Sequence, residues 1–203
     1  MSLGFEKSDE RIRQAVKTAT AADIIIFAAA SNSGSQFPHK RVAFPARLSG
    51  HVFSIRSATA QRKLADASPV PRAGEDNFAV LGEAITAAYV GNKDSAYFSG
   101  SSFATPVAAG IAALILEFSK HKRYIPPKQR GSSKNKYVDG VSLEAQKLLC
   151  SYEGIRKMLR YMSAVDDLAV TEGFALISPW TLFAEGRENE WLWEELRFQM
   201  MNL

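Results

Sequence analysis

Ser99-Gly100-Ser101-Ser102-Phe103-Ala104-Thr105-Pro106 is the stretch that decides the fold and the chemistry of this chain. It opens an alanine-rich apolar run that continues to Phe118, which predicts a buried helix from about Ser101 to Phe118. Gly100 allows a tight turn before the helix. Ser102 is thus predicted beside the unpaired N–H groups and the positive dipole end of a helix, a setting that suits a hydroxyl nucleophile.

Upstream of this stretch the apolar pattern changes from helical to extended. Residues Asp9 to Ala22 have the spacing of an amphipathic helix. The continuous apolar run from Ile24 to Ala30 predicts a strand buried on both faces of a parallel sheet. Val52 to Ile55 is a second such run, and Phe78 to Tyr89 can hold a third extended segment. Together with the long helix, these elements predict an α/β layered domain.

Downstream of the long helix the pattern loosens. Lys120 to Gly140 is polar and basic and contains Pro126-Pro127, so we expect a loop or a disordered insertion that cannot bury enough surface to order itself. One further amphipathic helix is expected where apolar residues recur at helical spacing: Leu148, Leu149, Tyr152, Ile155, Leu159 and Met162. The acidic tail from Glu185 to Glu195 is interpreted as a final docked helix.

Charge and cysteine content narrow the class of protein. The formal charge is +4, but seven Lys and Arg lie between Lys120 and Lys136, and without them the balance is about −3. This local basicity argues against a nucleic-acid partner. Cys150 is the only cysteine, and no charged and apolar leader opens the chain, so a reducing, intracellular compartment is slightly favoured. The apolar stretch from Phe103 to Phe118 is shorter than a bilayer span, so no membrane association is expected.

The serine motif resembles that of the subtilase family of serine proteases, Gly-Thr-Ser-x-Ala-x-Pro. Gly100, Ser102, Ala104 and Pro106 match it, and Ser101 stands in the threonine place. The resemblance implies that Ser102 is the catalytic nucleophile. A serine that merely caps a core helix is the structural alternative, since serine is a favoured N-cap residue.

A second motif supports the same family. Ala29-Ala30-Ser31-Asn32-Ser33-Gly34 resembles the subtilase segment Ala-Ala-Gly-Asn-x-Gly, which implies that Asn32 donates to the oxyanion of the tetrahedral intermediate. The alternative is that Asn32 only forms a turn after the strand. Ser31, in place of the family's glycine, is expected to narrow the floor of the first specificity pocket, so that a bulky substrate side chain is disfavoured there.

A third motif is Met1-Ser2-Leu3-Gly4, which resembles the family segment that pairs with extended substrate. By this resemblance the substrate-binding residues are Ser2, Leu3, Gly4, Ala29, Ala30 and Ser31. Later segments around Gly154 and Ser178 are similar to the subtilase domains of fungal intracellular multidomain proteins. The family implies a peptide or protein substrate and acyl transfer through Ser102, and we expect no cofactor and no catalytic metal.

The sequence also departs from the family pattern. The motifs for the triad aspartate and histidine, Asp-[Ser/Thr]-Gly and His-Gly-Thr-His, are absent. His39 is interpreted as a loop residue near the specificity pocket, and His51 and His121 as residues before a strand and in the basic run. We therefore expect the base to come from an N-terminal half of the same domain. A catalytically inactive pseudoprotease fragment, or a peptide-binding module, remains the alternative.

These expectations define a fold and three segments. The fold is predicted as α/β, a three-layer parallel-sheet subtilase fold of which the chain holds the later strands and the nucleophile helix. Residues 1–118 are the C-terminal part of a subtilase catalytic domain, 119–140 a basic loop or insertion, and 141–203 a helical extension that packs on the domain.

Overall fold

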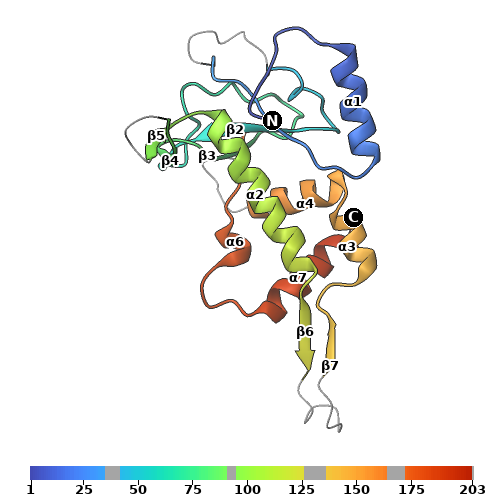
Figure 1. Cartoon of the computed structure of the whole chain (residues 1–203). Helices are drawn as coiled ribbons and strands as arrows, with labels where there is room; N and C mark the ends of the chain where they lie inside the picture. Colours follow the sequence, from blue (N-terminus) through green and yellow to red (C-terminus); the bar gives the residue numbers. More distant parts are fainter. Residues whose placement is uncertain (35–41, 91–94, 126–135, 164–171, 203) are drawn as a thin grey trace.

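A four-stranded parallel sheet forms the centre of the computed structural model, which describes residues 1–34, 42–90, 95–125, 136–163 and 172–202 (Figure 1). Its strand order is β1-β2-β3-β8, with bounds Phe27–Ala29, Phe53–Ala58, Phe78–Leu81 and Ala175–Leu176. Each neighbouring pair runs parallel, with Phe27 opposite Phe53 and Arg56 opposite Ala79. The parallel sheet predicted from the apolar runs is confirmed, although β1 is shorter than the run from Ile24 to Ala30.

Helix α1 (Glu10–Ala21) packs near β1, on one face of the sheet. It begins where predicted, because the Asp9 carboxylate accepts hydrogen bonds from the backbone N–H groups of Arg11 and Ile12. Val16 on its buried side shares a hydrophobic cluster with small and aromatic side chains from β1 and the following loops: Ala28, Ala30, Val42, Phe44, Ala46, Leu48 and Val52. This layer fixes the loops that follow β1.

Helix α2 (Ser101–Ser119) covers the opposite face, so the domain has three layers. Successive strand residues point to opposite faces, and Phe27, Phe53 and Phe78 therefore all meet α2, where Ala104 and Ala108 are fully buried. The Phe27 and Phe53 rings stack with centroids 5.0 Å apart. Alanines on this side let the helix approach the aromatic layer closely. By length and composition alone α2 could cross a membrane, but its contacts with β1, β2 and β3 show it as the core helix of this domain.

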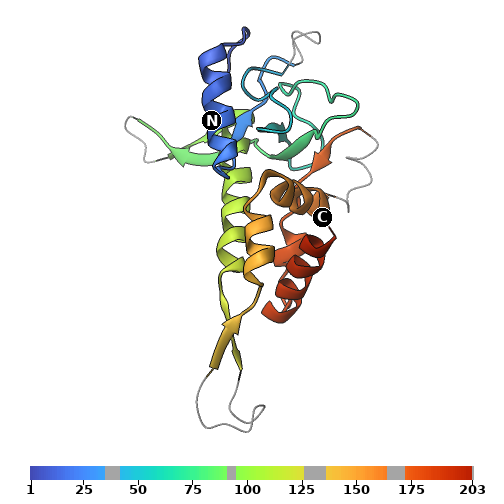
Figure 2. The same cartoon turned by 90° about the vertical axis from the view of Figure 1, so that its right-hand side faces the viewer.

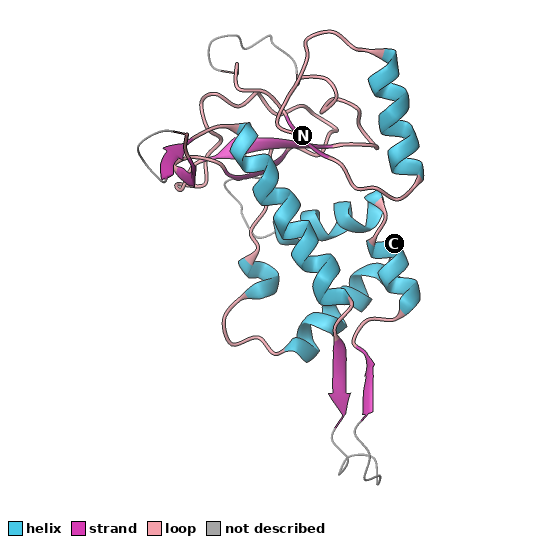
Figure 3. Ribbon diagram, viewed as in Figure 1, coloured by secondary structure: helices cyan, strands magenta, loops and turns pink. Residues whose placement is uncertain are grey.

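The C-terminal helices share one core with α2. These are α3 (Leu143–Leu149), α4 (Tyr152–Ser163), α6 (Trp180–Phe183) and α7 (Asn189–Met201), and Figures 2 and 3 show them gathered around the far half of α2. Leu149, Leu159 and Leu196 are fully buried there. The described helices of residues 141–203 therefore pack in the same hydrophobic core as α2.

The single helix predicted around Leu148 to Met162 was wrong, since α3 and α4 are separate. The Ser151 hydroxyl accepts a hydrogen bond from the Gly154 N–H at 3.1 Å, which starts α4 in a new direction. Gly154 lies so close to the Leu148 carbonyl that a Cβ on it would stand 2.1 Å from that oxygen. Only glycine fits this reversal.

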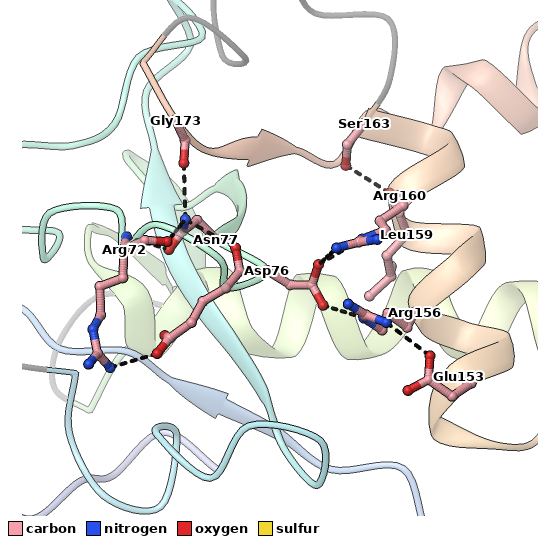
Figure 4. Close-up of polar contacts among 10 residues, drawn as sticks. Arg72, Asp76, Asn77, Glu153, Arg156, Leu159, Arg160, Ser163 and Gly173 are labelled. Atoms are coloured by element: carbon pink, nitrogen blue, oxygen red, sulfur yellow. Dashed lines mark hydrogen bonds and ion pairs between the residues drawn. The ribbon is translucent and has the colours of Figure 1, made fainter.

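Ion pairs join α4 to the loop that leads into β3 (Figure 4). Asp76, whose side chain is 13% exposed, pairs with Arg156 and with Arg160, whose Nη2 lies 2.6 Å from the carboxylate. The hydrogen bond to Asp76 raises the pKa of the Arg156 guanidinium. Asn77 next to it donates to the Gly173 carbonyl at 3.0 Å and so holds the segment before β8. The C-terminal helices are thus fastened to the sheet by charge as well as by apolar contact.

Two antiparallel ribbons complete the fold. β4 (Ile85–Ala88) pairs with β5 (Ser95–Phe98), and β5 is followed directly by α2. β6 (Lys122–Ile125) pairs with β7 (Lys136–Asp139) and projects from the far end of α2 in Figures 1 and 2. The predicted loop from Lys120 to Gly140 was therefore wrong at both ends, because these short β-prone runs pair with each other despite their charge. The middle of that segment, 126–135, lies outside the described residues.

Candidate active site

Ser102 is the second residue of α2, as the sequence predicted. Its position depends on Gly100, which precedes the helix with φ +130°, a conformation that favours glycine. The Gly100 N–H donates to the Gly82 carbonyl at the end of β3 at 2.7 Å. Ser102 is partly buried, and its backbone N–H belongs to the first helical turn, where N–H groups have no helical acceptor. The sheet thus anchors the turn that presents the Ser102 hydroxyl and N–H.

Asn32 reaches the same turn from the end of β1. Its Oδ1 accepts two hydrogen bonds from Ser101, one from the backbone N–H and one from the hydroxyl, each at 2.8 Å. The Ser101 hydroxyl also lies 3.1 Å from the Ser31 carbonyl. Because Oδ1 is held in this way, the amide Nδ2 is left as the donor on the exposed Asn32 side chain. The motif of Asn32 and the motif of Ser102 therefore meet at Ser101, the residue directly before Ser102.

The sequence motifs did not predict that Ser101 positions the Asn32 side chain. Ser101 is 1% exposed and holds the Asn32 amide, whereas the motif comparison treated it only as a conservative change. Its place in the motif was the available signal, since serine keeps the hydroxyl of the family threonine. The hydroxyl of Ser101 is itself buried, and Asn32 Oδ1 is the acceptor that satisfies it.

Replacing Gly100 by alanine is expected to lower the free energy of unfolding by about 1–3 kcal/mol. A Cβ at this position would stand 2.9 Å from Asn32 Nδ2 and would keep the unfavourable φ. Gly110→Ala is the matched control, because open space surrounds that position inside α2. It should raise stability by up to about 1 kcal/mol. Urea unfolding of both variants checks this, and equal effects would contradict it.

Two backbone segments flank Ser102. The Ser2 hydroxyl donates to the Ser102 carbonyl at 2.8 Å. Met1 lies along β1, since its carbonyl accepts from the Ala29 N–H at 3.0 Å. The structure therefore brings Ser2 and Ser31, one from each predicted substrate-binding segment, to the start of α2. Ser2, Leu3 and Gly4 are exposed, whereas Ala29 and Ala30 are buried.

The described histidines are not brought to Ser102. His51 Nδ1 lies 3.1 Å from the hydroxyl of Thr20 on α1. His121 lies beyond the C-terminal end of α2 and faces Glu117 at 3.8 Å. The helix separates His121 from Ser102 by about 25 Å at 1.5 Å per residue. His39 lies outside the described residues.

Comparison with known proteins identifies the family. The model described as "Subtilase family" (peptidase S8) matches residues 1–139. The chain belongs to the subtilase family. Subtilisin DY from Bacillus licheniformis is 33% identical over 116 residues, which cover 57% of this chain and 41% of that protein. The subtilisin-like protease het-Q2 from Podospora anserina is 32% identical over 126 residues, 58% of this chain and 33% of that protein. The chain thus spans less than half the length of these subtilases.

Solved structures agree on the fold. The patellamide maturation protease PatA superposes with a TM-score of 0.60 at 20% identity, covering 96% of this chain and 60% of that one. The prenylagaramide maturation protease PagA gives 0.56, also at 20% identity, over 89% and 57%. At this identity the likeness shows the fold alone. It extends past residue 139, so the C-terminal helices take part in the shared architecture.

Proposed function

We propose that this chain supplies the nucleophile Ser102 and the oxyanion donor Asn32 of a subtilase serine endopeptidase. The observation that carries the proposal is the double hydrogen bond from Ser101 to Asn32 Oδ1, which sets a side-chain amide beside the helix start that bears Ser102. Neither a helix cap nor a loop turn requires that arrangement. Subtilases are peptide-bond hydrolases, and the two segments at Ser102 suit an extended peptide.

The reaction would run by acyl transfer. The Ser102 Oγ attacks the peptide carbonyl carbon while a base takes its proton, and the carbonyl oxygen becomes an oxyanion. The backbone N–H of Ser102 and the Asn32 Nδ2 stabilise that charge. The C–N bond then breaks as the amine takes the proton, which leaves an acyl ester on Ser102. Water, activated by the same base, hydrolyses the ester.

The base and its aspartate would come from the N-terminal half of the same domain. His51 and His121 are held away from Ser102 by Thr20 and by the length of α2, which supports an outside source. β1 is also an end strand of the described sheet, and only Met1 pairs along its outer side. An open pocket of about 370 Å³ adjoins it, lined by Met1, Ser2, Ile25, Ile26, Phe27, Thr105, Pro106 and Ala109. This partly apolar face is where the other half would dock.

An inactive peptide-binding module is the second candidate. The observation in its favour is the lack of both family motifs for the aspartate and the histidine. Such a module would keep the two flanking segments and bind extended peptide without cleaving it.

Peptide hydrolysis by the chain with and without its missing half tests the proposal. Alone, the chain should give no more than the roughly 10³–10⁴-fold acceleration over water that an oxyanion hole and binding supply without a triad. Addition of a polypeptide that carries the aspartate and histidine motifs should restore steady turnover. Steady turnover by the chain alone, lost with His39→Ala, would instead place the base within this sequence. Binding without turnover in the assembled domain would favour the peptide-binding module.

A further inference from the structure

The chain around Ala65 takes the place of β1 beside β2 once β1 has ended. The Ala30 N–H donates to the Ile55 carbonyl at 2.9 Å, the last contact of this kind between the two strands. On the same side of β2, the Ser57 carbonyl accepts instead from the Ala65 N–H at 2.9 Å. The chain that leaves β1 therefore cannot continue along β2, and it turns away from the sheet toward Asn32.

Ser68 binds this segment to β2 through its side chain. Its hydroxyl accepts from the Ser57 N–H at 3.0 Å and donates to the Ser57 carbonyl at 2.9 Å, and so replaces the pairing that β1 no longer provides. The Arg56 Nε donates to the Pro69 carbonyl at 3.2 Å. Ser68 is 7% exposed and Arg56 is 1% exposed, so water hardly competes for these contacts. Two successive residues of β2 thus hold the backbone of residues 67–69.

The turn that carries Asn32 lies against this fixed backbone. The Gly34 N–H donates to the Ala67 carbonyl at 2.9 Å. A Cβ built on Gly34 would stand 1.8 Å from the Ser68 carbonyl oxygen, so the Gly34 backbone directly contacts Ser68. Two positions earlier, Asn32 Oδ1 is bound by Ser101. The turn is therefore held at one end by the start of α2 and at the other by residues 67–69.

We propose that Ser68 is a positioning residue of the active site, which sets the turn of Asn32 so that the side-chain amide meets the oxyanion. This inference rests on the proposed function and adds to it a residue outside both sequence motifs. Without the Ser68 hydroxyl the buried Ser57 N–H would lose this acceptor, and the backbone that contacts Gly34 would be free to shift. Even a small displacement of Asn32 weakens a donor that has to lie at hydrogen-bond distance from the developing charge.

Hydrogen exchange at Ser101 tests the inference without requiring catalysis. The Ser101 N–H lies in the first turn of α2, which offers it no helical acceptor, so its protection depends on Asn32 Oδ1. In the isotope-labelled full chain, nuclear magnetic resonance should show that Ser68→Ala speeds exchange at Ser101 about tenfold more than at Ile111, whose N–H inside α2 reports overall unfolding. Ser57→Ala is the matched control. That hydroxyl is buried without a hydrogen-bond partner among the described residues, so its loss should leave the ratio unchanged.

Ser68→Cys is the milder variant if Ser68→Ala does not fold. The thiol takes the place of the hydroxyl but is a weaker donor and acceptor, so the exchange ratio should rise several-fold.

A double-mutant cycle in the complete domain separates positioning from general support of the fold. Ser68→Ala should lower kcat about tenfold, with KM unchanged, while Asn32 is present. It should lower kcat by less than about twofold once Asn32 has been replaced by alanine, because the residue that Ser68 positions is then gone. A residue that only stabilised the fold would reduce activity equally in both backgrounds.

Three results would overturn the inference: equal changes in exchange at Ser101 and Ile111, the same selective change in the Ser57→Ala control, or equal losses of kcat with and without Asn32. The result is separable from the proposed function. Selective exchange at Ser101 in a domain that never acquires turnover would contradict the protease proposal and leave the role of Ser68 standing. Turnover at a rate independent of Ser68 would do the reverse.

Discussion

Replacement of Ser102 by alanine in a complete protease domain, in which this chain follows a segment with the triad aspartate and histidine, should lower kcat by about 10⁶-fold. In the proposed mechanism the Ser102 hydroxyl oxygen forms the acyl ester, so its loss removes the covalent route. What remains is the stabilisation of the oxyanion by the backbone and Asn32. Initial rates on a chromogenic peptide measure the change, with KM expected to stay within a few-fold because Ser102 adds little to substrate binding.

Ser99→Ala is the matched control for this experiment. Ser99 belongs to the same motif, but its hydroxyl accepts a hydrogen bond from the Ala84 N–H at 3.1 Å and so supports the turn. Loss of that bond costs about 1 kcal/mol, which corresponds to a several-fold effect at most. If the Ser102 variant kept more than a hundredth of the activity, Ser102 would not be the nucleophile.

The elements predicted best from the sequence are those whose signal is local. Asp9 marks the start of α1 through its own side chain, and the long apolar run after Gly100 specifies α2. The apolar runs that became β1 and β2 are bounded by turn residues within a few positions. In each case the deciding interactions join residues close in sequence, or follow from burial alone.

The elements predicted wrongly are those in which a stronger pattern of spacing or charge concealed the deciding contacts. Helical spacing continues from Leu148 across Ser151 to Ile155, so periodicity could not reveal the break that Ser151 and Gly154 cause. The β6–β7 ribbon pairs Lys122 with Asp139 across the chain, and its high charge resembles that of a solvated loop. The first error reflects a local cap within a continuous helical spacing, and the second reflects strand pairing that overrides the composition of the segment.

For the candidate site, the sequence predicted which residues take part but not how they are arranged. The two motifs identify Ser102 and Asn32 because the spacing of residue types within each motif is specific. Their mutual arrangement, however, depends on Ser101 and Asn32, which lie 69 residues apart and meet only because β1 and α2 are adjacent. The ion pairs of Asp76 with Arg156 and Arg160 likewise depend on the tertiary fold, since they join side chains 80 and 84 residues apart.

Replacement of Asn32 by alanine in the complete domain should lower kcat by about 10²–10³-fold with little change in KM. That range is the one measured for the loss of such a donor in subtilisin itself, a relative of this chain. A donor in the proposed role would act on charge that develops only in the transition state, so substrate binding should be spared. Steady-state kinetics on the same peptide provide the measurement.

Because alanine also removes the acceptor for Ser101, two further variants separate the donor from the support of the loop. Asn32→Asp keeps an oxygen for the Ser101 N–H and hydroxyl, which both lie 2.8 Å away, but it loses the N–H donor and adds a negative charge. Its kcat should fall at least as far as that of Asn32→Ala. Ser101→Ala keeps the donor and the backbone bond to Oδ1, and the loss of one hydrogen bond of about 1 kcal/mol should cost only several-fold. If Asn32→Asp were harmless while Ser101→Ala were severe, Asn32 would act through loop structure, and the oxyanion stabilisation would have to come from the backbone N–H of Ser102 alone.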